Sequence, residues 1–167
     1  MRAYRLGFAV ALVVFALDQL AKWIVTGPMG LIEIGDQHVF LPFFQFTLTH
    51  NEGISLGLFN ATNPVGRWML VGLTSAIAVG VAVWIGREKN RIDQAALGMV
   101  LGGALGNILD RTVHGYVVDF LDLHFGEFRP FLVFNVGDAA ISIAVVILLL
   151  RAFLTRKEGT KETIEHA

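Results

Sequence analysis

The sequence lacks cysteine and carries little charge. The absence of cysteine excludes disulfides, thiolate metal sites and a cysteine nucleophile. Charged residues make up only 16% of the chain, against about 25% in an ordinary soluble domain. The five histidines are scattered and form no HExxH or similar cluster, so we expect no metal and no other cofactor. A chain this apolar is not expected to bind nucleic acid.

Apolar residues are abundant instead. The chain of 167 residues, enough for one domain, is 54% hydrophobic, with a mean hydropathy of +0.62. Four apolar segments stand out, at about residues 6–25, 68–85, 95–113 and 135–154. About twenty helical residues span about 30 Å, the hydrocarbon thickness of a bilayer. We therefore predict an α-helical integral membrane protein with four transmembrane helices.

The third apolar segment is the weakest of the four, because it is rich in glycine. Its glycines are Gly98, Gly102, Gly103 and Gly106. The segment also reads as a core helix of a soluble protein. We prefer a membrane helix, since small residues allow neighbouring helices to approach closely. The first segment resembles a signal peptide, but it has no small-x-small cleavage site and Asp18 and Lys22 continue it, so we expect it to be retained.

The distribution of Lys and Arg predicts the orientation in the membrane. With both termini in the cytoplasm, nine of these residues lie inside, namely Arg2, Arg5, Arg87, Lys89, Arg91, Arg151, Arg156, Lys157 and Lys161. Only Arg67 and Arg129 fall on the outer loops. Cytoplasmic loops carry the excess of positive residues, so residues 27–66 and 114–133 are predicted to lie outside. We expect one membrane-embedded domain over residues 1–154 and a disordered cytoplasmic tail over 155–167.

The outer loops carry their own structural signals. Phe44, Phe46 and Leu48 alternate with polar residues, a pattern that predicts a strand with one apolar face. We expect a small sheet within about residues 30–60, resting on the outer membrane surface. The second outer loop contains Phe120, Phe125, Phe128 and Phe131, which suits a short interfacial segment. The alternative is a mobile loop whose aromatic side chains enter the lipid.

Two aspartates at the edges of apolar segments are the sharpest functional candidates. Asp119 follows the third segment, and Asp138 begins the fourth. A carboxylate near hydrocarbon is unfavourable, so such residues usually face a bundle interior or a watery cavity. Two facing carboxylates can share a proton and activate water, as in aspartic proteases. Each also has a structural alternative, Asp138 as a helix cap and Asp119 as an interfacial loop residue.

Three further polar groups accompany the aspartates. Asp18 and Lys22 lie four residues apart and share a helix face, as a structural ion pair or as a substrate contact. Asn107, Asp110 and Arg111 share a face of the third helix, which indicates a polar network, although an arginine there can also reach the headgroups. Asn51, Glu52 and Gly53 end the predicted strand, either as a plain turn or as a site that pairs with an extended peptide.

Hydroxyl nucleophiles are poorly supported. Ser55, Ser75 and Ser142 lie in no GxSxG or SxxK context. A pairing of Lys22 with Ser55 is sterically conceivable, but no motif supports it. The paired carboxylates therefore remain the stronger hypothesis.

The polar residues fall in five motifs that resemble those of bacterial lipoprotein signal peptidase, also called signal peptidase II. The motifs are LDQLAK at residues 17–22, NEGIS at 51–55, GGALGNILDR at 102–111, VVDF at 117–120 and FNVGD at 134–138. Their order and spacing cover nearly the whole chain. One departure is Gly137, which stands where this family usually has alanine.

The resemblance implies a membrane aspartic endopeptidase that needs no cofactor. It would remove signal peptides from prolipoproteins, cutting before a cysteine that carries diacylglycerol. Asp119 and Asp138 would form the catalytic pair. Substrate-contacting or supporting roles would fall to Asn51, Gly53, Asn107, Asp110, Arg111, Asn135, Asp18 and Lys22. The resemblance also implies a location in the bacterial inner membrane, with lipid and lipidated prolipoprotein as partners and a β-cradle at the outer face. A monomer is enough for this chemistry, and we expect one.

Two functions of other classes compete with this interpretation. A small proton-coupled transporter also uses membrane aspartates, but it needs a polar path across the bilayer, whereas the ionisable residues cluster near the outer end. A noncatalytic scaffold has no need of paired acids. The five motifs favour the peptidase over both.

Overall fold

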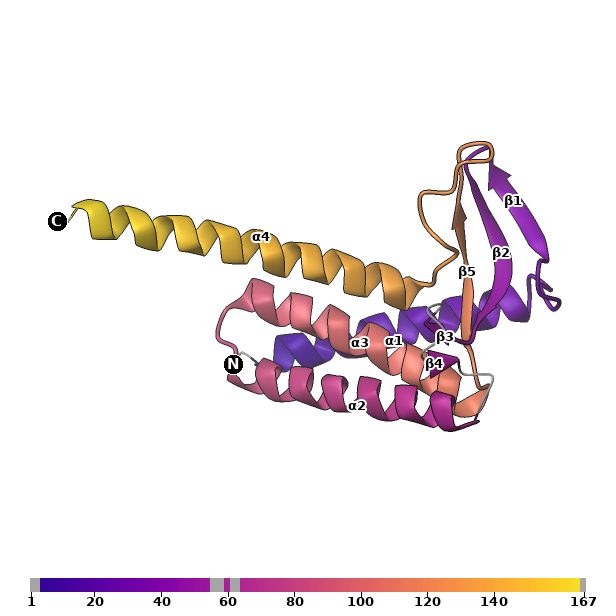
Figure 1. Cartoon of the computed structure of the whole chain (residues 1–167), viewed down its shortest axis with the longest axis horizontal. Helices are drawn as coiled ribbons and strands as arrows, with labels where there is room; N and C mark the ends of the chain where they lie inside the picture. Colours follow the sequence, from indigo (N-terminus) through magenta and orange to yellow (C-terminus); the bar gives the residue numbers. More distant parts are fainter. Residues whose placement is uncertain (1–3, 55–58, 61–63, 166–167) are drawn as a thin grey trace.

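Four long helices form the body of the protein. The computed structural model describes residues 4–54, 59–60 and 64–165. The helices are α1 (Tyr4–Thr26), α2 (Pro64–Arg87), α3 (Arg91–Val113) and α4 (Val136–Glu165). Each contains a segment long and apolar enough to cross a membrane. The four helices run along the long axis of the molecule (Figure 1), so the predicted spans are confirmed.

Helix α3 occupies the centre of the bundle. It packs against the other three helices. Of the most apolar 18-residue stretch of α3, 44% is buried, a larger share than in any other span described. A Cβ atom at Gly102 would overlap the carbonyl oxygen of Ala11 on α1, and one at Gly103 would overlap that of Gly137 on α4. These glycines therefore permit close helix contact, as expected for the membrane-helix interpretation.

A small antiparallel sheet lies at one end of the bundle. Its strands are β1 (Gln37–Leu41), β2 (Phe44–Asn51) and β5 (Val117–Leu123), in the order β1-β2-β5. A second pair consists of β3 (Gly53–Ile54) and β4 (Phe59–Asn60). The sheet stands where α1 and α3 end and α2 and α4 begin (Figure 1). The predicted sheet is confirmed, but its third strand comes from the second loop.

The second loop differs from its predicted form at Phe120. This residue lies on β5, not in an interfacial segment, and only 1% of its surface is exposed. Its ring meets that of Phe46 edge to face, with the centroids 5.2 Å apart. It belongs to a buried cluster that contains Val25, Leu31, Leu48 and Val118. Phe125, Phe128 and Phe131, by contrast, are 61%, 66% and 62% exposed, which is compatible with contact with the membrane surface.

The polar tail also differs from its predicted form. Helix α4 continues to Glu165, whereas the sequence predicts disorder from Thr155. Lys, Arg and Glu are good helix formers, and extending an existing helix avoids the unfavourable nucleation step. Helix α4 therefore projects beyond the rest of the bundle (Figure 1).

Candidate active site

Two backbone arrangements bring Asp119 and Asp138 to the same end of the bundle. Asp119 lies on β5, opposite Thr49 of β2. Asp138 lies in the first turn of α4. The segment before α4 is held to β5 because the Phe134 N–H donates to the Leu121 carbonyl at 3.1 Å, while the Leu121 N–H donates back at 2.7 Å. The start of α4 is thereby fixed beside Asp119.

Asn135 links the two aspartates directly. Its side-chain Nδ2 donates to Asp119 Oδ1 at 2.6 Å, and its Oδ1 accepts from the Asp138 N–H at 2.8 Å. Its own backbone N–H donates to Asp138 Oδ2 at 3.3 Å. This exchange is the reciprocal capping arrangement of a helix N-terminus. Asn135 is fully buried. Its side chain caps α4 and orients the Asp119 carboxylate, while its backbone N–H orients the Asp138 carboxylate.

Two more asparagines complete the hydrogen bonds of the pair. Asn107 on α3 donates to Asp138 Oδ1 at 2.8 Å and accepts from Asn135 Nδ2 at 3.1 Å. Asn51 at the end of β2 donates to Asp119 Oδ2 at 3.0 Å. Its Oδ1 accepts from the N–H of Gly53, whose φ of 137° favours glycine. Asn51 therefore contacts the acidic pair itself rather than forming a plain turn.

Asp18, Lys22 and Asp110 form a buried ion cluster beneath the aspartates. Lys22 Nζ lies 2.7 Å from Asp18 Oδ2 and 2.8 Å from Asp110 Oδ2. The exposed fractions of Asp18, Lys22 and Asp110 are 0%, 4% and 2%. A buried charge requires such partners. The ion-pair interpretation of Asp18 and Lys22 is therefore confirmed, with Asp110 as a third member.

The ion cluster also holds the backbone next to each aspartate of the pair. Asp18 Oδ1 accepts from the N–H of Gly137 at 2.9 Å, directly before Asp138. Asp110 Oδ2 accepts from the N–H of Val118 at 3.1 Å, directly before Asp119. Because one lysine neutralises both acceptors, the cluster couples the positions of the two aspartates.

Gln19 belongs to the same cluster, although no sequence pattern predicts a role for it. Gln19 Nε2 donates to Asp110 Oδ1 at 3.0 Å and to Asp18 Oδ2 at 3.2 Å. It lies next to Asp18 in the first motif. A carboxylate oxygen buried in the bundle requires a hydrogen-bond donor. This requirement is the only indication in the sequence that Gln19 has a role.

Arg111 brings positive charge to the pair. It is 9% exposed, and both Asp138 and Asp119 lie within its electrostatic reach. Its buried Nε has no hydrogen-bond partner among the described residues. A buried donor without a partner is unfavourable, so Arg111 has free capacity to contact a further group near the aspartates.

Asp119 is strongly affected by its surroundings. Burial raises the pKa of Asp119 to about 6, and the negative charge of Asp138 contributes to this rise, whereas the hydrogen bonds from Asn51 and Asn135 oppose it. Perturbed carboxyl groups in clefts are typical of active sites. Asp119 can therefore retain a proton at a pH where a solvent-exposed aspartate is ionised.

A separate carboxylate, Asp122, anchors the loop that follows β5. Its Oδ2 accepts from Gln45 and Thr47, both at 2.8 Å, and from Arg129 at 2.7 Å. Burial pushes the pKa of Asp122 upward, but the hydrogen bonds from Gln45 and Thr47 and the charge of Arg129 outweigh it, so the pKa is lowered. The sequence does not reveal this anchor, because two of its partners are distant along the chain.

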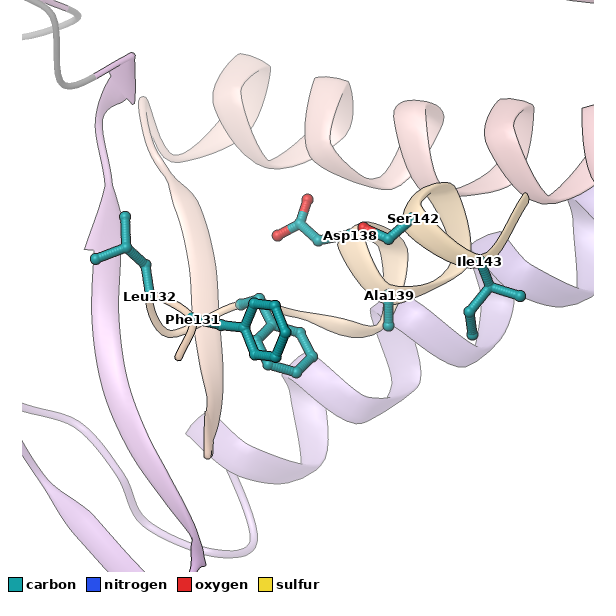
Figure 2. Close-up of a pocket in the computed structure, with 7 residues that line it drawn as sticks. Phe131, Leu132, Asp138, Ala139, Ser142 and Ile143 are labelled. Atoms are coloured by element: carbon teal, nitrogen blue, oxygen red, sulfur yellow. The ribbon is translucent and has the colours of Figure 1, made fainter. Parts of the chain in front are cut away.

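Two cavities meet at the acidic pair. The first, of about 290 Å³, is lined by Phe131, Leu132, Phe134, Asp138, Ala139, Ser142 and Ile143. The second, of about 350 Å³, is lined by Thr49, His50, Asn51, Glu52, Gly53, Asp119, Leu132 and Val133. Figure 2 shows the carboxylate of Asp138 pointing from α4 into the space beside the sheet. Each aspartate thus faces its own cavity, one apolar and one polar, and Leu132 lines both.

The remaining expectations from the sequence are that a serine nucleophile is poorly supported and that the protein has no metal site. Ser55, considered as a partner of Lys22, lies outside the described residues. Lys22 itself is engaged by two carboxylates. Within residues 4–54, 59–60 and 64–165, no group of three or more His, Asp or Glu side chains is placed to hold a metal ion.

The fold and the site define a class of protein, a four-span membrane protein with two asparagine-bridged aspartates beneath a small sheet. Comparison with known proteins agrees with this class. The family model described as "Signal peptidase (SPase) II" matches residues 10–154. The chain belongs to the signal peptidase II family and is a multi-pass inner membrane protein.

Individual relatives agree with the family match. The chain is 53% identical to a lipoprotein signal peptidase of Rhizorhabdus wittichii, over 91% of this chain and 88% of the relative. It is 51% identical to one of Sphingopyxis alaskensis, over 90% and 86%. A solved bacterial membrane enzyme structure at 2.3 Å resolution matches with a TM-score of 0.76 and 26% identity, covering 92% of this chain and 90% of that chain.

Proposed function

We propose that this protein is an aspartic endopeptidase that removes signal peptides from diacylglyceryl-modified prolipoproteins, cutting before the lipidated cysteine. The single observation that carries the catalytic type is the Asn135 bridge between Asp119 and Asp138. It holds two carboxyl groups in one site at the ends of two membrane spans. The name shared by the relatives supplies the prolipoprotein substrate.

The chemistry follows from the two carboxyl groups sharing one proton. The ionised member accepts a proton from a water molecule, whose oxygen attacks the carbonyl carbon of the scissile peptide bond. The protonated member donates a hydrogen bond to the carbonyl oxygen and stabilises the developing oxyanion. The tetrahedral intermediate then expels the amine of the cysteine as the proton passes to its nitrogen. Asn51 and Asn107 keep the two carboxyl groups aligned throughout.

The remaining polar residues support this chemistry in distinct ways. We assign Asp18, Lys22 and Asp110 a positioning role, because they hold the backbone before each catalytic aspartate. Arg111 has an unused buried donor, and we assign it a contact with the substrate backbone. Gly53 fixes the turn that presents Asn51. The protein works as a monomer in this proposal, because every group used comes from one chain.

We further propose that the active site faces the outside of the membrane, with both termini in the cytoplasm. The nine-to-two distribution of Lys and Arg supports this orientation. The acidic pair lies at the end of the bundle that carries the sheet. A diacylglyceryl cysteine would there keep its acyl chains in the bilayer while its peptide bond reaches the two aspartates.

The distribution of buried polar side chains argues against the transporter alternative. In the described residues, the buried polar side chains of the four spans are Asp18, Lys22, Gln94, Asp110 and Arg111. All of them except Gln94 lie near the sheet end. A proton path needs polar groups at successive depths, and this arrangement instead concentrates them at one depth.

The proposal is tested by incubating the purified protein in nanodiscs with a diacylglyceryl-modified prolipoprotein and measuring release of the signal peptide. Wild-type protein should cleave, and Asp119→Asn and Asp138→Asn should each lose nearly all activity. The matched control is Asp93→Asn, which makes the same chemical change at the far end of α3. Cleavage that survives in either folded dyad variant would exclude the aspartic mechanism.

A further inference from the structure

The apolar cavity beside Asp138 contains one hydroxyl group. Of the residues lining this cavity, only Asp138 and Ser142 carry polar side chains. Ser142 follows Asp138 by four residues on α4, so the two lie on one helix face, about one turn of 5.4 Å apart. Figure 2 shows both on the part of α4 that borders the cavity.

The Ser142 hydroxyl is not used by the helix. Thr26, Thr74 and Thr112 each donate a hydroxyl hydrogen bond to the carbonyl four residues earlier, at 2.9, 2.8 and 2.7 Å. Among the described residues, Ser142 makes no such bond, and it is exposed. A hydroxyl without a partner at membrane depth is unfavourable, so it is available to an acceptor from outside the chain.

The cavity continues into an apolar face that contacts lipid. Ile143 lines the cavity and is 53% exposed. Val146 and Leu150 follow on the same side of α4 and are 55% and 58% exposed. These three residues belong to the membrane-spanning part of α4. A ligand in the cavity can therefore extend an acyl chain along α4 into the bilayer without crossing a polar barrier.

We propose that this cavity binds the glyceryl ester portion of the lipidated substrate, with the Ser142 hydroxyl donating a hydrogen bond to an ester carbonyl. This proposal rests on the proposed function. With the scissile bond at the aspartates, the thioether and glycerol carbons of the modified cysteine place the first ester a few bonds away. This flexible link is long enough to span one turn of α4. The acyl chain then passes Ile143, Val146 and Leu150.

The polar cavity gives the substrate its direction. Asp119 and the end of β2 line that second cavity, whose walls suit the backbone of an extended peptide. Leu132 lines both cavities, so it lies at the junction where peptide meets lipid. The lipid therefore belongs on the Asp138 side of the scissile bond, and the peptide backbone on the Asp119 side.

The proposal predicts a coupling between one hydroxyl and one carbonyl. The test compares wild-type protein and Ser142→Ala on two precursors of identical sequence, one carrying diacylglycerol and one carrying ether-linked dialkylglycerol, which lacks ester carbonyls. A neutral hydrogen bond corresponds to roughly a three- to tenfold change in binding. Ser142→Ala should raise KM for the ester substrate by that factor, leave kcat nearly unchanged, and leave both constants for the ether substrate unchanged.

Two control variants show whether the effect belongs to the Ser142 hydroxyl. Ser142→Thr should restore the ester KM, and Ser75→Ala on α2 should alter neither substrate. An equal effect of Ser142→Ala on both substrates, or no effect, overturns the proposal. A third precursor, which carries diacylglycerol but differs at the residue before the cysteine, completes the test. An effect of Ser142→Ala that follows this residue rather than the ester also overturns the proposal, because the cavity would then bind a signal-peptide side chain. If wild-type protein cleaves no lipidated precursor, the proposed function itself fails.

Discussion

Replacing Asp119 with asparagine should change how stability depends on pH. Burial and the charge of Asp138 raise the pKa of Asp119 from 3.8 to about 6. One pKa unit corresponds to about 1.4 kcal/mol, so keeping Asp119 ionised above pH 6 destabilises the fold by about 3 kcal/mol. Asparagine removes this penalty. It also removes one acceptor for Asn51 or Asn135, which costs about 1–3 kcal/mol at every pH.

The sign follows from linkage. Below pH 3.8 the carboxyl group is protonated in both the folded and unfolded chains, so burial carries no ionisation penalty. As the pH rises from 3.8 to about 6, the unfolded chain releases the proton first, and wild-type stability falls. The variant has no such proton. The stability of Asp119→Asn relative to wild type should therefore increase by about 2 kcal/mol between pH 4 and pH 7, because part of the full change of about 3 kcal/mol occurs below pH 4.

The assay is the unfolding midpoint of both proteins in the same nanodisc between pH 4 and pH 8. The control is Asp36→Asn, because the backbone N–H groups of Glu33 and Ile32 lower the pKa of Asp36. A lowered pKa confines the change in stability to pH values below about 3.8, so between pH 4 and pH 8 this control should show almost no trend. A stability difference for Asp119→Asn that is the same at pH 4 and pH 7 refutes the reasoning.

Three further predictions test the packing, the site and the topology. Gly103→Ala should lower the unfolding midpoint sharply, because the new methyl group overlaps the backbone of α4. Gly80 faces open space, so Gly80→Ala should leave the midpoint unchanged. Equal midpoints for the two variants would contradict the packing. Arg111→Ala should reduce signal-peptide release more than stability, and normal turnover with a large loss of stability would make Arg111 structural. An impermeant thiol reagent applied from outside should label Glu127→Cys but not Lys89→Cys; the reverse pattern contradicts the orientation.

The sequence by itself determined the membrane spans and the candidate residues. Hydropathy is a local property, so each span could be predicted without knowing its neighbours. The i, i+3 and i, i+4 spacings of Asn107, Asp110 and Arg111, and of Asp18 and Lys22, placed them on shared helix faces. The strand at Phe44 was equally visible, because its alternation is a short-range pattern.

Only the tertiary structure decided how these residues meet. The third strand β5 is held by pairing with β2, more than sixty residues away along the chain, so its sequence alone suggested an interfacial loop and misplaced Phe120. Asn135 became the bridge between the aspartates because Phe134 pairs with Leu121. Non-local pairing of this kind leaves no periodic signal in the sequence.

The same reason separates the two carboxylates of β5. Asp119 could be found from its distinctive motif, whereas the anchoring role of Asp122, three residues later, depends on Gln45, Thr47 and Arg129. Local pattern thus determined which residues carry charge into the membrane. Burial and hydrogen-bond partners depend on the whole fold. Long-range packing therefore decided which charged residues form structural ion pairs and which remain available for catalysis.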